Sequence, residues 1–123
     1  MIKILVCGSR DFVDTELIEQ LVFVDHEDFT CIIEGGARGA DTIAQQLAFK
    51  YGMACLHVEA NWAKYGRAAG PIRNKWMLEF GQPDIVYAFH TNKALSKGTN
   101  NMVNQAINTG ITVVEVTDTL EIV

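Results

Sequence analysis

The sequence predicts an α/β fold, a Rossmann-like three-layer sandwich with a five-stranded parallel sheet in the order 3-2-1-4-5. Three observations lead to this prediction. The chain contains five short apolar runs rich in β-branched residues, these runs are nearly continuous in their apolar character, and helical patterns lie between them. Strands that alternate with helices give right-handed crossovers and a doubly wound sheet.

The expected strands are IKILVCG (residues 2–8), TCIIEGG (30–36), MACLHVEA (53–60), DIVYAFH (84–90) and ITVVEV (111–116). They are too continuous to be amphipathic strands with one wet face. We therefore expect strands of a parallel sheet that helices cover on both faces.

The first two expected helices have clear starts or stops. Asp14 can cap the first, whose apolar positions are Leu17, Ile18, Leu21 and Val22. In the second, apolar residues from Ala40 to Tyr51 recur at spacings of three and four, and Gly52 is placed to end the helix.

Proline and glycine punctuate the other two helices. Pro71 is expected at the first helical position of residues 71–80, with Gly81 as the stop. Thr99 can cap a fourth helix that Gly110 ends.

Length and composition set the broad class. A chain of 123 residues with 49% hydrophobic residues predicts one globular domain, residues 1–123. No apolar run is long enough to span a membrane and no secretory signal is present, so we expect a cytoplasmic protein. Cys7, Cys31 and Cys55 each lie in a strand-like run, which favours reduced core thiols. The histidines are too scattered for a metal site, and no cofactor is expected.

Charge distribution is more informative than net charge. The net charge of −5 disfavours broad binding to nucleic acid or to anionic membranes. All four arginines, Arg10, Arg38, Arg67 and Arg73, fall in loops or at helix starts. This placement favours a small anionic ligand, although solvated loops also collect charge without any ligand.

A glycine-rich turn, EGGARGAD, precedes the second helix. Gly35, Gly36 and Gly39 lie just before amides that have no partner within the helix. A strand, a glycine turn and a helix start together form a recurrent phosphate site. The alternative is that these glycines only permit backbone angles that other residues avoid.

The remaining unusual residues lie at the same predicted edge of the sheet, where the carboxyl ends of its strands meet. Gly8, Ser9 and Arg10 follow the first strand, NWAKYGRAAG (61–70) follows the third, and HTNKALSKGTNN (90–101) starts at the end of the fourth. Ligands of doubly wound folds bind at this edge, where the strand order reverses.

Four side chains there each have two possible interpretations. With Pro71 at the helix start, Arg73 is expected in the first turn, where the helix dipole disfavours a cation, so it indicates either an anion or a salt bridge. Asp41 is either a helix cap or an acceptor for ribose hydroxyls. Trp62, like Tyr65, either stacks on a base or anchors the long loop.

Four motifs, CGSRDFVD, EGGARGADTIA, NWAKYGRAAGPIRNKWM and SKGTNNMVNQA, resemble the SLOG superfamily and its small cpYpsA-related, YspA-type branch. The resemblance spans about residues 4–114. It implies a Rossmann-like domain that binds nucleotides or nucleotide-derived molecules. The superfamily includes the "lonely guy" enzymes, which hydrolyse the N-glycosidic bond of nucleoside monophosphates, and sensor domains for NAD-derived signals.

The catalytic members carry a P-G-G-x-G-T-x-x-E motif and an upstream R-x-x-x-M. Arg73 and Met77 match the second pattern, and Gly98 and Thr99 match part of the first. The leading P-G-G is absent, and Met102 occupies the glutamate position. A thioether cannot transfer a proton or stabilise a developing cation, so the resemblance implies binding without efficient cleavage.

We therefore expect a sensor or sponge for a nucleotide-derived small molecule. The alternatives are an N-glycosidase, with Arg73 as its candidate catalytic residue and Asp11, Asp41 or Glu34 in place of the missing glutamate, and a protein-binding module. The candidate ligand-binding residues are Gly8, Ser9, Arg10, Gly35, Gly36, Arg38, Gly39, Asp41, Trp62, Arg67, Arg73, Asn74, Ser96, Gly98 and Thr99.

Large apolar groups also lead us to expect a homodimer or a higher homo-oligomer. FVDHEDF (residues 23–29) and the stretch from Trp76 to Phe80 carry more of them than one sheet face needs.

Overall fold

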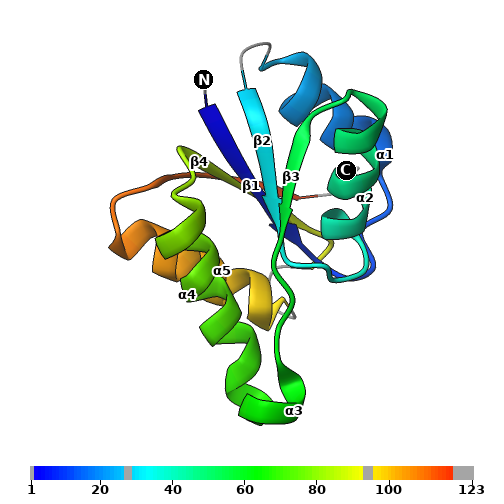
Figure 1. Cartoon of the computed structure of the whole chain (residues 1–123). Coiled ribbons are helices and arrows are strands. Elements are labelled where there is room, and N and C mark those ends of the chain that lie inside the picture. The colour runs from blue at the N-terminus through cyan, green and yellow to red at the C-terminus, as the bar shows by residue number, and fades with distance from the viewer. Residues whose placement is uncertain (1, 27–28, 93–95, 118–123) are drawn as a thin grey trace.

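A single parallel sheet forms the centre of the chain, as the sequence predicts. The computed structural model describes residues 2–26, 29–92 and 96–117. The sheet order is β3-β2-β1-β4-β5, with every neighbouring pair parallel, which confirms the predicted fold class and topology (Figure 1). The strands are β1 (Ile2–Gly8), β2 (Phe29–Glu34), β3 (Ala54–His57), β4 (Ile85–His90) and β5 (Thr112–Thr117).

Helices cover both faces of the sheet. The helical segments are α1 (Thr15–Ile18), the π-helix η1 (Glu19–Val24), α2 (Ala40–Lys50), α3 (Trp62–Tyr65), the 3-10 turn η2 (Gly66–Ala68), α4 (Ala69–Gly81) and α5 (Lys97–Asn108). Residues of α1, η1 and α2 pack on one face, and residues of α4 and α5 pack on the other (Figure 1).

The two apolar cores follow from the alternation of side chains along β1. Ile4 and Val6 belong to the core under α1 and α2, whereas Leu5 and Cys7 belong to the core under α4 and α5. Successive side chains of a strand point to opposite faces, so the part of β1 that is covered on both sides, residues 4–7, is apolar at every position.

Two of the predicted helix signals are confirmed and one is wrong. Asp14 caps α1, its Oδ1 accepting the Leu17 N–H at 3.1 Å, and Gly52 follows α2 with φ of +67°. Thr99, however, does not cap α5, because that helix already begins at Lys97 with Ser96 as its N-cap. Thr99 is instead buried in the first turn.

The start and end of α4 also differ from the prediction. The helix begins at Ala69, directly after the helical segments α3 and η2, which follow β3. Pro71 still lies in the first turn, where its missing N–H has no helical partner to lose. At the other end Gln82, with φ of 50°, adopts the left-handed cap conformation. Gly81 has a different role, because a Cβ there would lie 2.8 Å from Ile33 Cδ1 in β2.

The expectation that all strands are covered on both faces is wrong for β3. All four of its residues are exposed, because β3 is an edge strand of the sheet. Cys55 in this strand is consequently exposed, whereas Cys7 is buried and Cys31 lies between these extremes; all three thiols are free. The prediction of buried cysteines therefore holds for Cys7 alone.

Two features are absent from residues 2–26, 29–92 and 96–117. No helix there has the length and apolar character needed to cross a membrane. No group of three or more His, Cys, Asp or Glu side chains there is arranged to hold a metal ion.

Candidate functional site

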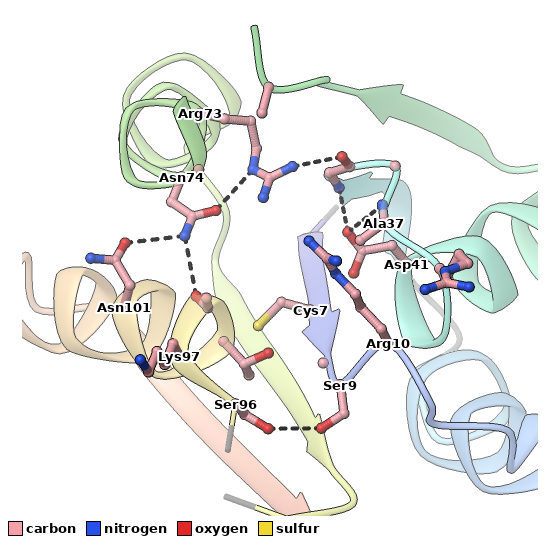
Figure 2. A pocket seen from close by; sticks show the side chains of 18 of the residues that line it. Cys7, Ser9, Arg10, Ala37, Asp41, Arg73, Asn74, Ser96, Lys97 and Asn101 are labelled. Carbon is pink, nitrogen blue, oxygen red and sulfur yellow. Dashed lines mark hydrogen bonds between the residues drawn. The ribbon is translucent and has the colours of Figure 1, made fainter. Parts of the chain in front are cut away.

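A cleft of about 1370 Å³ opens beyond the carboxyl ends of β1, β2 and β4 (Figure 2). Its walls are the segment after β1, the glycine turn before α2, the excursion between β3 and α4, and the start of α5. Ligand pockets commonly measure about 300–1,000 Å³, so this cleft has room for a mononucleotide or a larger derivative. Its position is the edge where doubly wound folds bind ligands.

Every predicted site residue except Gly39 lines this cleft. Gly39 belongs to the same turn, but it packs against the backbone of Ser9 and Arg10. Its φ is +82°, so here the alternative reading of the glycines, as residues that permit an unusual backbone angle, applies.

Several lining residues were not among the predicted ones. Cys7, which the sequence suggests as a core thiol, and Met77, which matches the R-x-x-x-M pattern, also line the cleft. Glu59 and Asn101 line it as well, and nothing in the sequence distinguishes them from ordinary surface polar residues.

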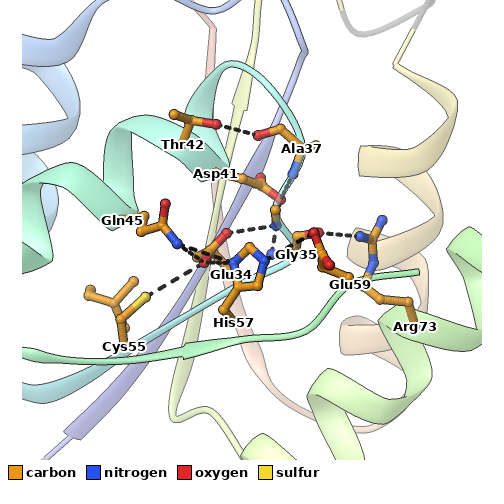
Figure 3. A network of polar contacts seen from close by, with 12 residues as sticks. Glu34, Gly35, Ala37, Asp41, Thr42, Gln45, Cys55, His57, Glu59 and Arg73 are labelled. Atoms are coloured by element: carbon orange, nitrogen blue, oxygen red, sulfur yellow. Dashed lines mark hydrogen bonds and ion pairs between the residues drawn. The ribbon is translucent and has the colours of Figure 1, made fainter. Parts of the chain in front are cut away.

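The glycine turn is held from within by two carboxylates (Figure 3). Asp41 Oδ2 accepts the N–H of Gly35 at 3.0 Å and that of Ala37 at 3.3 Å, and Glu34 Oε1 accepts the N–H of Gly36 at 2.6 Å. Acidic side chains beside the turn therefore satisfy the N–H groups of Gly35, Gly36 and Ala37 within the protein. The first-turn amides of α2 are a different set, because that helix begins at Ala40.

Glu34 is the centre of a polar network behind the turn (Figure 3). It is fully buried, and its Oε2 lies 2.5 Å from His57 Nδ1 and 3.6 Å from Cys55 Sγ. His57 Nε2 in turn lies 3.4 Å from Glu59 Oε1. The hydrogen bond to Glu34 raises the pKa of His57, so the imidazolium form is favoured between the two carboxylates.

Asp41 has the most perturbed carboxyl group of the cleft wall. Burial raises its pKa from an ordinary 3.8 to about 7, and the neighbouring Glu34 adds to the rise. The hydrogen bonds from the turn and the charge of Arg73 oppose this rise. A carboxyl group that titrates near neutral pH inside a cleft has the properties of a general acid or base.

Arg73 lies across the cleft from Asp41, on α4 (Figure 2). Because α4 begins at Ala69, Arg73 falls after the first turn, and the predicted conflict with the helix dipole is wrong. Its Nη1 donates to the Gly35 carbonyl at 2.7 Å, and its Nε donates to Asn74 Oδ1 at 3.0 Å. Among the described residues no carboxylate forms a salt bridge with Arg73, so these residues do not support the alternative of an ion pair.

Serine hydroxyls join the first strand to the start of α5. Ser9 Oγ and Ser96 Oγ lie 2.8 Å apart, and Ser9 Oγ also accepts the N–H of Thr91 at 3.1 Å. Ser96 Oγ also donates a hydrogen bond to the Asn92 carbonyl oxygen, at 3.0 Å. These bonds fix the wall of the cleft on the α5 side.

The two aromatic residues of the excursion have different surroundings. Tyr65 packs edge-to-face on Trp76 of α4, with ring centroids 6.1 Å apart, and so anchors the excursion. Trp62 lines the mouth of the cleft and is 53% exposed. Trp62 is therefore the ring with surface left to stack on a base.

Cations outnumber carboxylates around the cleft, although the whole chain carries a net charge of −5. The lining cations are Arg10, Arg38, Arg67, Arg73 and Lys97, and the lining carboxylates are Asp11, Asp41 and Glu59. This local excess of positive charge suits an anionic ligand.

The fold and the cleft define a Rossmann-like α/β protein with an open cleft at the carboxyl edge of its sheet. The chain belongs to the YspA, cpYpsA-related SLOG family, whose model matches residues 2–65. The Gene 61 protein of Mycobacterium phage D29 is 31% identical over 126 residues, covering 96% of this chain and 98% of that protein. No solved structure matches the chain significantly.

Proposed function

We propose that the protein binds a nucleotide or nucleotide-derived molecule in this cleft, as a sensor or a sponge, without cleaving it efficiently. The observation that carries the proposal is the cluster of five cationic side chains around a cleft with an exposed indole, in an otherwise acidic chain. Arginine groups would bind phosphate oxygens by charge-assisted hydrogen bonds, and Trp62 would stack on the base.

The geometry divides the cleft into two chemically different ends. The α5 end offers Lys97, the first-turn amides of α5 and the hydroxyl of Thr99, which suit phosphate oxygens. At the α2 end the donors of the glycine turn are satisfied by Glu34 and Asp41, so this end suits ligand groups that donate hydrogen bonds, such as ribose hydroxyls.

Weak catalysis is supported by Met102. This residue is fully buried in the core between the sheet and α5, and it does not line the cleft. At this position of α5 the chain therefore presents no carboxylate to a ligand. A missing acid–base group lowers the rate of such reactions by about 10²–10⁴-fold.

One observation favours cleavage of an N-glycosidic bond as a second candidate function. Asp41 lies in the cleft wall with a pKa of about 7. Such a carboxyl group could deliver a proton to a leaving base at neutral pH. Arg73, on the opposite wall, would then bind the phosphate of the substrate.

The test is a thermal-shift screen of nucleoside mono- and diphosphates, cyclic nucleotides, NAD and ADP-ribose, followed by calorimetry on each compound that stabilises the protein. Arg73→Ala should remove most of the stabilisation. Lys75→Ala is the matched control, because Lys75 lies on the same helix but is exposed, pairs with Glu79 and does not line the cleft. Equal binding by the two variants, or no stabilisation by any compound, would contradict the proposal.

Chromatography after incubation separates the two candidate functions. Intact ligand supports a sensor or sponge. Release of free base or nicotinamide at ordinary enzymatic turnover, about 1 per second or faster, would instead establish the glycosidase, and Asp41→Asn should then abolish the release.

A further inference from the structure

Asn74 is a buried amide at the meeting point of three walls of the cleft (Figure 2). It is 3% exposed, and its hydrogen-bond partners are Arg73, Gly98 and Asn101. Its Oδ1 accepts the Nε–H of Arg73 at 3.0 Å, and its Nδ2 donates to the Gly98 carbonyl at 3.3 Å and to Asn101 Oδ1 at 3.1 Å.

The chemistry of these partners fixes which way the amide points. An arginine Nε can only donate, and a backbone carbonyl can only accept. Turning the amide over would place its NH₂ group against Arg73 and its oxygen against the oxygen of Gly98. With both donors used inside the protein, Asn74 has little hydrogen-bonding capacity left for a ligand.

The contacts form one continuous path across the cleft. The Gly35 carbonyl accepts Arg73 Nη1, Arg73 Nε reaches Asn74, and Asn74 reaches the Gly98 carbonyl in the first turn of α5. The path therefore links the glycine turn, α4 and the start of α5, which carry the two ends of the site.

A second branch extends the path along the interface of α4 and α5. Gln105 Nε2 donates to Asn101 Oδ1 at 2.8 Å and to the Pro71 carbonyl at 3.1 Å. This polar seam lies beside an apolar contact that includes Met77 and Met102. Apolar contacts tolerate sliding of one helix along another, whereas a buried amide with fixed partners is satisfied in one register.

We infer that Asn74 is a positioning residue for the cleft: it holds the guanidinium of Arg73 and the first turn of α5 in one fixed relation, and it does not itself contact the ligand. The expected effect of Asn74 on ligand binding rests on the proposed function, because Arg73 and the α5 turn are the groups proposed to bind the phosphate. The link between Asn74 and Arg73 can be tested without any ligand.

The first experiment measures hydrogen exchange of the Arg73 Nε–H by ¹⁵N NMR in the ligand-free protein. Asn74→Leu fills a similar volume but removes the acceptor, and exchange should accelerate about tenfold or more, as expected when a hydrogen bond to a charged group is lost. Asn74→Asp keeps the acceptor and should keep the protection. Asn101→Ala removes the contacts of Asn101 with Asn74 and Gln105 but leaves the acceptor of Asn74, and it should also keep the protection. Unchanged exchange in Asn74→Leu would overturn the inference.

The second experiment measures binding of AMP and ADP-ribose by calorimetry. Asn74→Leu should weaken binding about tenfold, and the double variant with Arg73→Ala should lose less than the sum of the two single losses, because part of the effect of Asn74 acts through Arg73. Additive losses in the double variant, or full affinity in Asn74→Leu, would overturn the inference.

The two experiments separate the two possible failures. If the wild-type protein binds neither nucleotide, the proposed function fails for these probes while the exchange measurement still decides the role of Asn74. If Asn74→Leu does not fold, which thermal unfolding would reveal, Asn74→Ala replaces it with the same expectations.

Discussion

Glu34 Oε2 and His57 Nδ1 lie 2.5 Å apart and join the ends of β2 and β3. The other oxygen of Glu34 accepts the N–H of Gly36, so the same carboxylate fixes the glycine turn. His57 also closes the space around that turn, because a Cβ on Gly36 would lie 2.6 Å from His57 Cε1. The shape of the α2 end of the cleft thus depends on a histidine that does not line it.

The pH dependence of stability should reveal this pair. The folded-state pKa of His57 is raised above its ordinary 6.5, chiefly by the hydrogen bond to Glu34. The contribution of the His57–Glu34 pair to the free energy of unfolding is therefore fully present below pH 6.5. It is lost as the pH rises through the raised pKa of folded His57. Chemical denaturation across this pH range should show that the free energy of unfolding of the wild type falls as the pH rises. The fall should be smaller for the His57→Gln variant. Identical pH profiles would contradict a charged His57.

Asp41→Asn should stabilise the protein at alkaline pH. The folded-state pKa of Asp41, about 7, exceeds the ordinary 3.8, so the native state holds a proton that the unfolded state releases between these values. Above pH 7 the buried side chain is ionised at a cost that asparagine avoids, while the amide oxygen can still accept the turn hydrogen bonds.

One pKa unit corresponds to about 1.4 kcal/mol, and we expect at least that gain in the free energy of unfolding at pH 8. The gain should shrink as the pH falls toward 4. A less stable Asp41→Asn protein at pH 8 would mean that the attraction of nearby arginines outweighs the burial of the charge.

Gly98→Ala should separate stability from binding. Gly98 lies in the first turn of α5, and a Cβ there would meet nothing within 4 Å. Alanine should therefore stabilise the helix by roughly 0.5–1 kcal/mol, while its methyl group enters the cleft and weakens nucleotide binding. Thermal unfolding and calorimetry measure the two effects. Gly36→Val is no substitute for this test, because Gly36 has φ of +77° and its variant would strain the fold.

Self-association remains a prediction, and the structure narrows the residues that could carry it. Phe23 is buried in the core, so it is not available to a partner, and Trp76 is engaged by Tyr65. Phe80 on α4 and Phe49 on α2 are 76% and 88% exposed. We expect light scattering to give a mass above 13.6 kDa and Phe49→Ser/Phe80→Ser to return it to that value. A monomeric wild type would refute this.

The fold could be predicted from the sequence because apolar runs and helix-capping residues can be recognised without knowledge of tertiary contacts. Continuous apolar runs gave the strands, and Asp14 and Gly52 marked the helix boundaries where they lie. The boundaries of α4 and α5 could not be predicted, because Pro71 and Thr99 are compatible with several positions in a first turn. Tertiary contacts decide among these positions, namely the 3-10 turn η2 that leads into α4 and the hydrogen bond between Ser9 and Ser96.

The residues around the cleft could be predicted as a group, because the fold places strand ends together. Their pairings could not. The sequence shows that Glu34 and Asp41 flank a glycine turn, but not that their oxygens face inward and satisfy its amides. Asn74 was among the predicted ligand-binding residues, but its partners on α5 could not be predicted, because they meet it only when α5 packs against α4.

Gly81 shows how the shape of the cleft can be set from outside it. The missing side chain allows the last turn of α4 to lie against Ile33, where a methyl group would be 2.8 Å from Cδ1. Arg73 is eight residues earlier on the same helix, about 12 Å along its axis. A single added carbon there would be relieved either by a new rotamer of the Ile33 side chain or by a shift of this end of α4 away from β2. A shift of the helix as a rigid unit would move the guanidinium away from the Gly35 carbonyl and widen the mouth, although every lining side chain stayed the same.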